Sequence, residues 1–190
     1  MIKKYLKLFY VFLLLISFSL SSGEITHASV EYDQGVYTVE FDATVMTSLA
    51  RTYYLLTDFD NLEVINDSIV ESDRLESSDP SMQRCRLLLK SCILFFCRDV
   101  VLTEDVRSNG KDEIIATIDP EHSDFESGSS VWNLLPADSQ HTNIILRRTL
   151  EPDFWIPPVI GPLLIKNKMI QELSRMIEQI EQHADANTNY

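Results

Sequence analysis

Catalysis and metal binding are the first chemistries to test against this sequence, and its histidines are too dispersed to support either. There are four of them: His27, His122, His141 and His183. None stands at a metal-ligand spacing from another histidine or from a cysteine. His122 and Asp124 could form an acid–base pair, but a histidine on a hydrated polar loop is the simpler interpretation. We therefore predict no metal site and no catalytic residue.

The motifs of calcium, phosphate and cofactor binding are also absent from the sequence. The run Asp58–Asn61 resembles a calcium loop only superficially, because the required glycine is missing and Leu62 takes the next alternate position. The five glycines are not clustered, which excludes a phosphate-cradling loop and the dinucleotide-binding fingerprint. Neither the G-x-S-x-G elbow nor the H-E-x-x-H helix occurs. We predict no cofactor.

One charged residue stands apart because of its position in a strand. Arg148 shares the parity of the apolar residues in Ile144–Leu150, so it could point toward the buried side of a sheet. A buried arginine must find a carboxylate, a carbonyl or a ligand head group, and Glu151 or Asp153 would be the partner at the strand end. The alternative interpretation places Arg148 near the sheet edge, where it reaches solvent.

Three cysteines leave at least one thiol outside any intramolecular disulfide. Cys92 and Cys97 are five residues apart, so a straight strand would place them on opposite faces, and they can pair only across a turn. Two interpretations of the intervening Ile93–Phe96 remain open. It is either a doubly buried strand or the tip of a long hairpin, an apolar loop beside Phe154–Ile156.

The elements that must position these groups are organised around a long C-terminal helix, predicted from Pro162 to Ala184. Proline is suited to the first helical turn, where its missing N–H costs nothing. Apolar residues recur every three or four positions along one face: Leu163, Ile165, Met169, Ile170, Leu173, Met176, Ile177 and Ile180. The opposite face, suited to water, carries Lys168, Gln171, Glu172, Arg175, Glu178, Gln179 and Gln182. The preceding Phe154–Ile160 is apolar, and its prolines exclude regular structure.

Upstream of this helix, alternating apolar and polar residues predict a sheet. A short helix with an N-cap at Thr47 or Ser48 follows the first strand. The predicted strands are Tyr37–Val45, Ile69–Leu75, Met82–Lys90, Val100–Val106, Glu113–Ile118, Ser130–Leu135 and Thr142–Leu150. Short connections make them antiparallel. We predict an α+β fold in which a curved antiparallel sheet of about seven strands surrounds the C-terminal helix.

The N-terminus predicts export, with the bacterial periplasm as the expected compartment. Three lysines precede the apolar run Leu8–Leu20, and small residues follow it, so residues 1–23 are predicted to be a signal peptide. A cut could follow Ser21–Gly23 or Thr26–Ala28. The alternative is an uncleaved anchor that tethers the protein to the inner membrane. The folded domain is predicted at residues 30–185, with residues 186–190 as a disordered tail.

The charge of the chain excludes nucleic acid as a partner. The formal net charge is −13, and loss of the three lysines within residues 1–23 would move it to −16. Such a protein repels phosphate groups. Any contact with a membrane must therefore be apolar and transient, made through the loops predicted above.

The order of these elements, together with several short stretches, resembles the START-like (SRPBCC) superfamily, and within it the coenzyme Q-binding and polyketide cyclase-like branch. The resemblance covers roughly Val36 to His183. It is carried by Leu56–Leu62, Ser68–Ser72, Phe95–Arg98, Ser123–Phe125 with Trp132, and Glu151–Pro158.

This resemblance implies a helix-grip fold around a deep apolar cavity that holds lipids, isoprenoid quinones or polyketides. We expect an exported carrier of a hydrophobic small molecule; the alternatives are a polyketide cyclase or aromatase, or an interaction module without a cavity. The superfamily shares no universal catalytic residue, so none is transferred. The candidate cavity and rim residues are Tyr53, Ile93, Leu94, Phe95, Phe96, Trp132, Leu134, Leu146, Arg148, Phe154, Trp155, Ile156, Met169 and Leu173.

Overall fold

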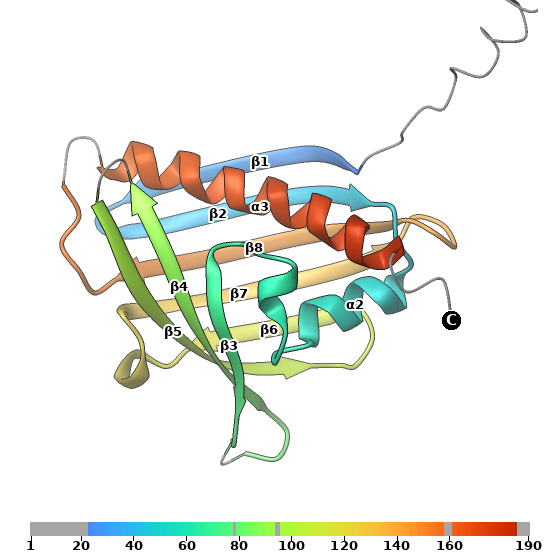
Figure 1. The fold of residues 1–190 in the computed structure, drawn as a ribbon, viewed down its shortest axis with the longest axis horizontal. Coiled ribbons are helices and arrows are strands. Elements are labelled where there is room, and N and C mark those ends of the chain that lie inside the picture. Colours follow the sequence, from blue (N-terminus) through green and yellow to red (C-terminus); the bar gives the residue numbers. More distant parts are fainter. Residues whose placement is uncertain (1–22, 78, 94–95, 158–160, 186–190) are drawn as a thin grey trace, which may run out of the picture.

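A computed structural model describes residues 23–77, 79–93, 96–157 and 161–185, and it has an α+β architecture (Figure 1). Eight antiparallel strands form one curved sheet in the order β1-β2-β8-β7-β6-β5-β4-β3. The strands are β1 Glu24–Asp33, β2 Val36–Val45, β3 Ile69–Leu75, β4 Gln83–Ile93, β5 Phe96–Ser108, β6 Glu113–Ile118, β7 Phe125–Pro136 and β8 Thr142–Pro152. The helices are α2 Leu49–Thr57 and α3 Gly161–Asp185, with short 3-10 turns at Leu62–Val64 and Pro120–His122. Residues 1–22 of the predicted signal peptide and the predicted tail lie outside the described residues.

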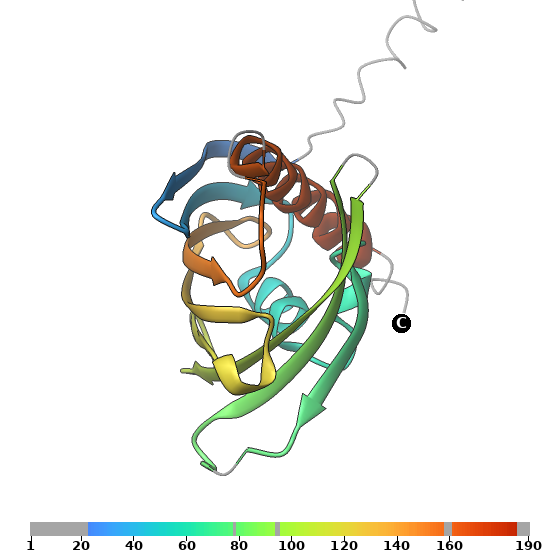
Figure 2. The same cartoon turned by 90° about the vertical axis from the view of Figure 1, so that its left-hand side faces the viewer.

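The long helix α3 lies across the concave side of the sheet. It contacts β1 and β2 on one flank and β4 on the other, so the sheet curls up on both sides of it (Figure 2). The alternating strands bury one face: in β2 the side chains of Tyr37, Phe41 and Val45 are fully buried, while Thr38 and Glu40 are exposed. No helix within the described ranges is both long and apolar enough to cross a bilayer.

The sheet has one strand more than the predicted seven, and the additional strand is β1. It runs along the edge beside β2, and Val30 is its only buried residue, so the sequence of β1 lacks the alternation that marks a half-buried strand. Gln34 and Gly35, both with positive φ, form the turn into β2. The sheet thus begins at Glu24, ahead of the predicted domain start at residue 30, and one predicted cleavage position, Thr26–Ala28, lies inside β1.

The segment around Cys92 and Cys97 is the end of a hairpin, so the interpretation as a doubly buried strand is wrong. Strand β4 ends at Ile93, β5 begins at Phe96, and Cys92 lies opposite Cys97. A disulfide joins these two cysteines, both of which are exposed. A reversal of the chain between them is what allows residues five apart to meet across two strands.

Candidate functional site

A pocket of about 730 Å³ lies between the concave face of the sheet and the N-terminal half of α3. Its volume falls within the range of small-molecule sites, roughly 300–1,000 Å³. The wall is predominantly apolar and comes from the sheet, from the segment after α2 and from α3. The sheet supplies Leu87, Leu89, Val100, Leu102, Ala116, Trp132, Leu146 and Leu150; Phe59, Leu62 and Ile65 follow α2; and Ile165, Met169 and Leu173 come from α3.

Of the residues predicted for the site, eight line this pocket: Trp132, Leu146, Arg148, Phe154, Trp155, Ile156, Met169 and Leu173. Two others do not. Leu134 is fully buried in the core, and the Tyr53 hydroxyl hydrogen bonds with the Ser108 hydroxyl at 2.7 Å. Leu94 and Phe95 lie outside the described residues, and the side chains of Ile93 and Phe96 are likewise not described. A ligand-binding role for these residues remains a prediction.

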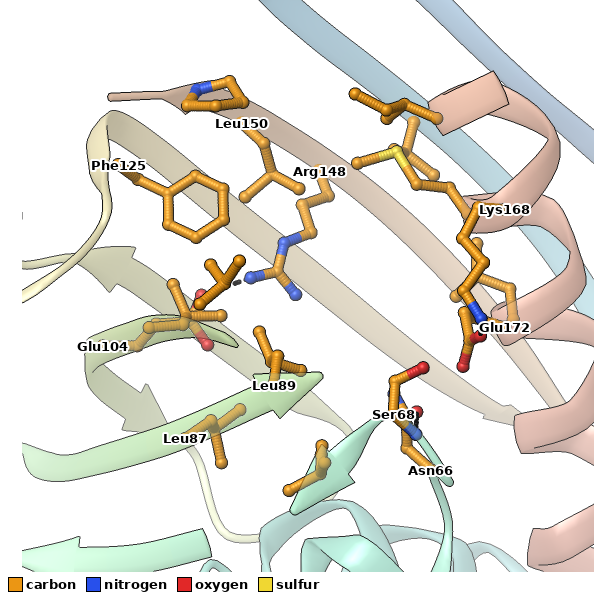
Figure 3. A pocket seen from close by; sticks show the side chains of 18 of the residues that line it. Asn66, Ser68, Leu87, Leu89, Glu104, Phe125, Arg148, Leu150, Lys168 and Glu172 are labelled. Carbon is orange, nitrogen blue, oxygen red and sulfur yellow. Dashed lines mark hydrogen bonds and ion pairs between the residues drawn. The ribbon is translucent and has the colours of Figure 1, made fainter. Parts of the chain in front are cut away.

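Arg148 points from β8 into the pocket and pairs with a carboxylate that the sequence analysis did not select (Figure 3). Its Nη2 lies 2.8 Å from Oε1 of Glu104 on β5, and both side chains are largely buried. Glu151 instead accepts a hydrogen bond from Ser127 at 2.8 Å, and Asp153 is exposed, so both predicted partners were wrong. The edge interpretation was also wrong, because β8 lies inside the sheet between β2 and β7.

Glu104 was missed although a local signal for it existed. It shares the strand parity of Val100, Leu102 and Val106, which are all buried. Only the curvature of the sheet, however, brings β5 across the concave space toward β8. Around this ion pair, Nε of Arg148 and the hydroxyl of Ser130, opposite Arg148 in register, are buried without a hydrogen-bond partner in the described part of the chain.

A second charged pair lines the pocket from α3. Lys168 and Glu172, one helical turn apart, form an ion pair, with side chains 29% and 15% exposed. They had been assigned to the water-facing side of the helix, which is wrong for these two residues. Each lies beside a stripe residue three positions earlier on the helical surface, Lys168 beside Ile165 and Glu172 beside Met169, so both charged residues stand at the margin of the pocket-facing side of α3. In Figure 3, Glu172 points toward Ser68 and Asn66, which line the same end of the pocket.

At the other end of the pocket, the adjacent aromatic residues Phe154 and Trp155 have opposite environments. The guanidinium of Arg98 lies 4.5 Å from the ring centroid of Phe154, and Phe125 meets the same ring edge-on at 6.3 Å. Arg98 is also paired with Asp124 at 3.4 Å. These contacts hold Phe154 against the domain, whereas Trp155 is 80% exposed, as is Leu163 on α3 at 61%.

Two potentially reactive side chains considered in the sequence analysis, His122 and Cys85, lie in environments that do not favour catalysis. His122 Nδ1 lies 2.8 Å from the carboxylate of Asp119, on the surface, so the suggested pair with Asp124 was wrong. Cys85 lies in the pocket wall, where burial, and then the charge of Glu104, raise the pKa of its thiol to about 12. It is therefore a protonated thiol at neutral pH and a poor nucleophile.

Among the described residues no group of three or more His, Cys, Asp or Glu side chains could hold a metal ion.

No protein-family model and no curated protein matches this sequence. Three solved structures with closely similar folds show what the architecture is. The Zhui aromatase/cyclase from a Streptomyces species superposes with a TM-score of 0.66 at 13% identity, covering 81% of this chain and 96% of its own. A START superfamily protein from Mycobacterium smegmatis gives 0.59 at 17% identity, covering 80% and 99%. A STAR-related lipid transfer protein from Xanthomonas axonopodis gives 0.56 at 15% identity, covering 83% and 98%.

The chain has the START helix-grip fold. At these identities the likeness establishes architecture, and the neighbours with this architecture include both an aromatase/cyclase and a STAR-related lipid transfer protein. The coenzyme Q-binding branch remains a prediction.

Proposed function

We propose that this START-fold protein binds a hydrophobic small molecule, a lipid or an isoprenoid, in the pocket beneath α3 and carries it in an exported compartment. The observation that supports this most directly is the apolar void of about 730 Å³ between sheet and helix. Burial of a ligand there would contribute about 0.8 kcal/mol for each methylene removed from water. Such a void also argues against an interaction module with a filled interior.

The test is to identify what the protein carries when it is purified without detergent. Organic extraction followed by mass spectrometry should release one class of apolar molecule, at up to one equivalent per chain. Protein unfolded and refolded in delipidated buffer serves as the control and should release none until it is reloaded. A wild-type protein that yields no apolar molecule and that takes up none after delipidation would contradict the proposal.

A ring-closing enzyme of the polyketide cyclase type is the second candidate. It is favoured by the Arg148–Glu104 pair, since a buried guanidinium could polarise a substrate carbonyl. Incubation with a linear poly-β-ketone thioester distinguishes the two candidates. A carrier returns the substrate unchanged, whereas a cyclase gives an aromatic product that is lost in an Arg148→Met/Glu104→Leu variant.

We further propose that the protein exchanges its ligand at a membrane through Trp155 and Leu163. Both are exposed apolar residues, and Trp155 lines the pocket while Leu163 directly precedes the lining residue Leu164. Tryptophan favours the boundary between water and hydrocarbon. The acidic chain disfavours anionic lipids, so vesicles of zwitterionic phosphatidylcholine, which carry no net charge, are the appropriate probe. Trp155→Ala should reduce cosedimentation with these vesicles. Leu135→Ala, an exposed apolar residue on β7, is the matched control and should not. Equal cosedimentation of all three proteins would refute the contact.

A further inference from the structure

The polar groups of the pocket form two separate sites on opposing walls. One is Arg148 with Glu104, both from the sheet, and the other is Lys168 with Glu172, both from α3 (Figure 3). Each site consists of one base and one acid in direct contact. The remaining charged residue in the described lining, Arg98, is paired with Asp124. The pocket therefore offers no unpaired cation to an anionic head group, which disfavours fatty acid anions and phospholipids.

The α3 site presents both a donor and acceptors to the interior. Both carboxylate oxygens of Glu172 are buried without a hydrogen-bond partner in the described part of the chain, and the Lys168 ammonium forms an ion pair with Oε1. An ammonium group has three N–H donors, and one contact with Glu172 leaves others available. On the opposite wall, one guanidinium nitrogen of Arg148 donates a hydrogen bond to Glu104. Other N–H groups of the same guanidinium therefore remain available as donors. Each cation thus has N–H donors for an acceptor oxygen of a ligand, and the α3 site in addition has carboxylate oxygens that a ligand hydroxyl could satisfy.

We infer that Lys168, positioned by Glu172, is a second polar subsite, and that the pocket selects an uncharged apolar molecule with acceptor oxygens at two separated positions, one for each wall. This inference rests on the proposed function. Carbonyl oxygens suit such a pair of donors, because they accept hydrogen bonds from both cations. A hydrogen bond with a charged donor is worth enough to change affinity about tenfold.

Displacement of the neutral fluorophore N-phenylnaphthylamine can test this with three probes of equal chain length. These are dodecanone with one keto group, dodecanedione with a keto group near each end, and dodecanoate. In the wild-type protein we expect dodecanone to bind more tightly than dodecanoate, and the diketone to be preferred over the monoketone. In Lys168→Met/Glu172→Leu the ratio of diketone to monoketone affinity should fall about tenfold. Comparing ratios removes the difference in hydrophobicity between the two ketones.

The control variant is Arg175→Gln/Glu178→Gln, which also removes one base and one acid from α3 but at exposed positions. Its affinity ratio should equal that of the wild type. An unchanged ratio in Lys168→Met/Glu172→Leu, or tighter binding of dodecanoate than of dodecanone, overturns the inference while leaving the carrier function intact. Failure of the wild-type protein to bind either the fluorophore or dodecanone would instead refute the carrier function itself.

If the double variant Lys168→Met/Glu172→Leu does not fold, an infrared measurement on the wild-type protein alone still tests the inference. The infrared carbonyl stretch of bound, carbonyl-labelled dodecanedione should shift to lower frequency for both keto groups, because both are hydrogen bonded. A spectrum in which one carbonyl keeps the frequency it has in hydrocarbon solvent would exclude the second subsite.

Discussion

The two halves of α3 carry the same apolar stripe but meet different surroundings. In the C-terminal half, Ile177 and Ile180 are buried in the core and do not line the pocket, and Met176, also buried, lies at the pocket's border. Glu181 Oε1 and Oε2 accept hydrogen bonds from the backbone N–H of Met46 and Gly23, at 2.8 and 3.0 Å. In the N-terminal half, by contrast, Ile165, Met169 and Leu173 are only partly buried and border the pocket.

This difference teaches that one helix can serve as core at one end and as the cover of a binding site at the other. Side chains that face a void lose dispersion contacts, so the N-terminal half contributes less to stability per apolar residue than the C-terminal half. The less stable part of a structure is also the part that opens at low cost. We therefore expect ligand to enter by movement of the first turns of α3, while the C-terminal turns stay docked.

The largest predicted change in the free energy of unfolding comes from truncating one apolar residue in each half of α3. Ile180→Ala removes a fully buried side chain and should lower the free energy of unfolding by about 3 kcal/mol. Met169→Ala enlarges an existing pocket and should cost only about 1 kcal/mol, while weakening binding of the naphthylamine probe. Urea denaturation of ligand-free protein measures both. Equal losses of stability would remove the distinction between the two halves.

The next largest predicted loss of stability comes from Glu181, the polar residue that anchors the C-terminal half of α3. Glu181→Leu leaves the N–H group of Met46 without its acceptor, and that of Gly23 as well in protein that keeps residue 23, and should cost about 2 kcal/mol. The control is Glu178→Leu, an exposed position on the same helix, where we expect a change within about 0.5 kcal/mol. If the two variants melt at the same temperature, Glu181 does not anchor α3.

Hydrogen exchange can sharpen the comparison without any mutation. Backbone amides between Leu164 and Leu173 should exchange about tenfold faster than those between Ser174 and Gln182, because opening of the N-terminal half breaks fewer packed contacts. Saturation with N-phenylnaphthylamine should slow only the first group. A uniform exchange rate along α3, in the presence and absence of the probe, would contradict a helix that opens from one end.

The smallest predicted change in stability concerns the ion pair between Asp42 and Arg147 on the outer face of the sheet. This pair should affect the stability of both halves of α3 equally. The hydrogen bond from Arg147, at 2.5 Å, lowers the pKa of Asp42 below its ordinary value of 3.8. The lowered pKa means that the pair stabilises the protein above pH 3.8 and that this contribution is lost as the pH falls through the folded-state value. Asp42→Asn should therefore cost less than about 1 kcal/mol at neutral pH, since both groups are partly exposed, and should flatten the acid limb of the stability curve. An unchanged acid limb would show that the pair contributes nothing.

The features that follow from short-range periodicity could be predicted from the sequence. The alternation in β2 and the stripe on α3 fixed both the element type and the buried face. Strand β1 could not be found this way, because an edge strand with only Val30 buried leaves no periodic signal. The hairpin end at Cys92 and Cys97 was ambiguous, since an apolar run of that length fits a buried strand equally well.

The charged groups of the site depend on contacts that periodicity does not encode. Arg148 was correctly singled out by its parity, but its partner Glu104 is 44 residues away in sequence and meets it only through the curvature of the sheet. Lys168 and Glu172 lie at the margin of the apolar stripe, where a helical wheel cannot decide between water and pocket. Whether an apolar face is packed or borders a void is likewise a property of how sheet and helix are spaced.

The central claim, that the space beneath α3 accepts an apolar guest, is tested most directly by filling it. Ala116 on β6 is buried and lines the pocket, whereas the next residue, Thr117, is exposed. Titration of delipidated protein with N-phenylnaphthylamine should show one saturable, blue-shifted site per chain in the wild type and in Thr117→Trp. Ala116→Trp should fold but lose this site. Saturable binding that Ala116→Trp leaves intact, or no binding to the wild type, would contradict the account.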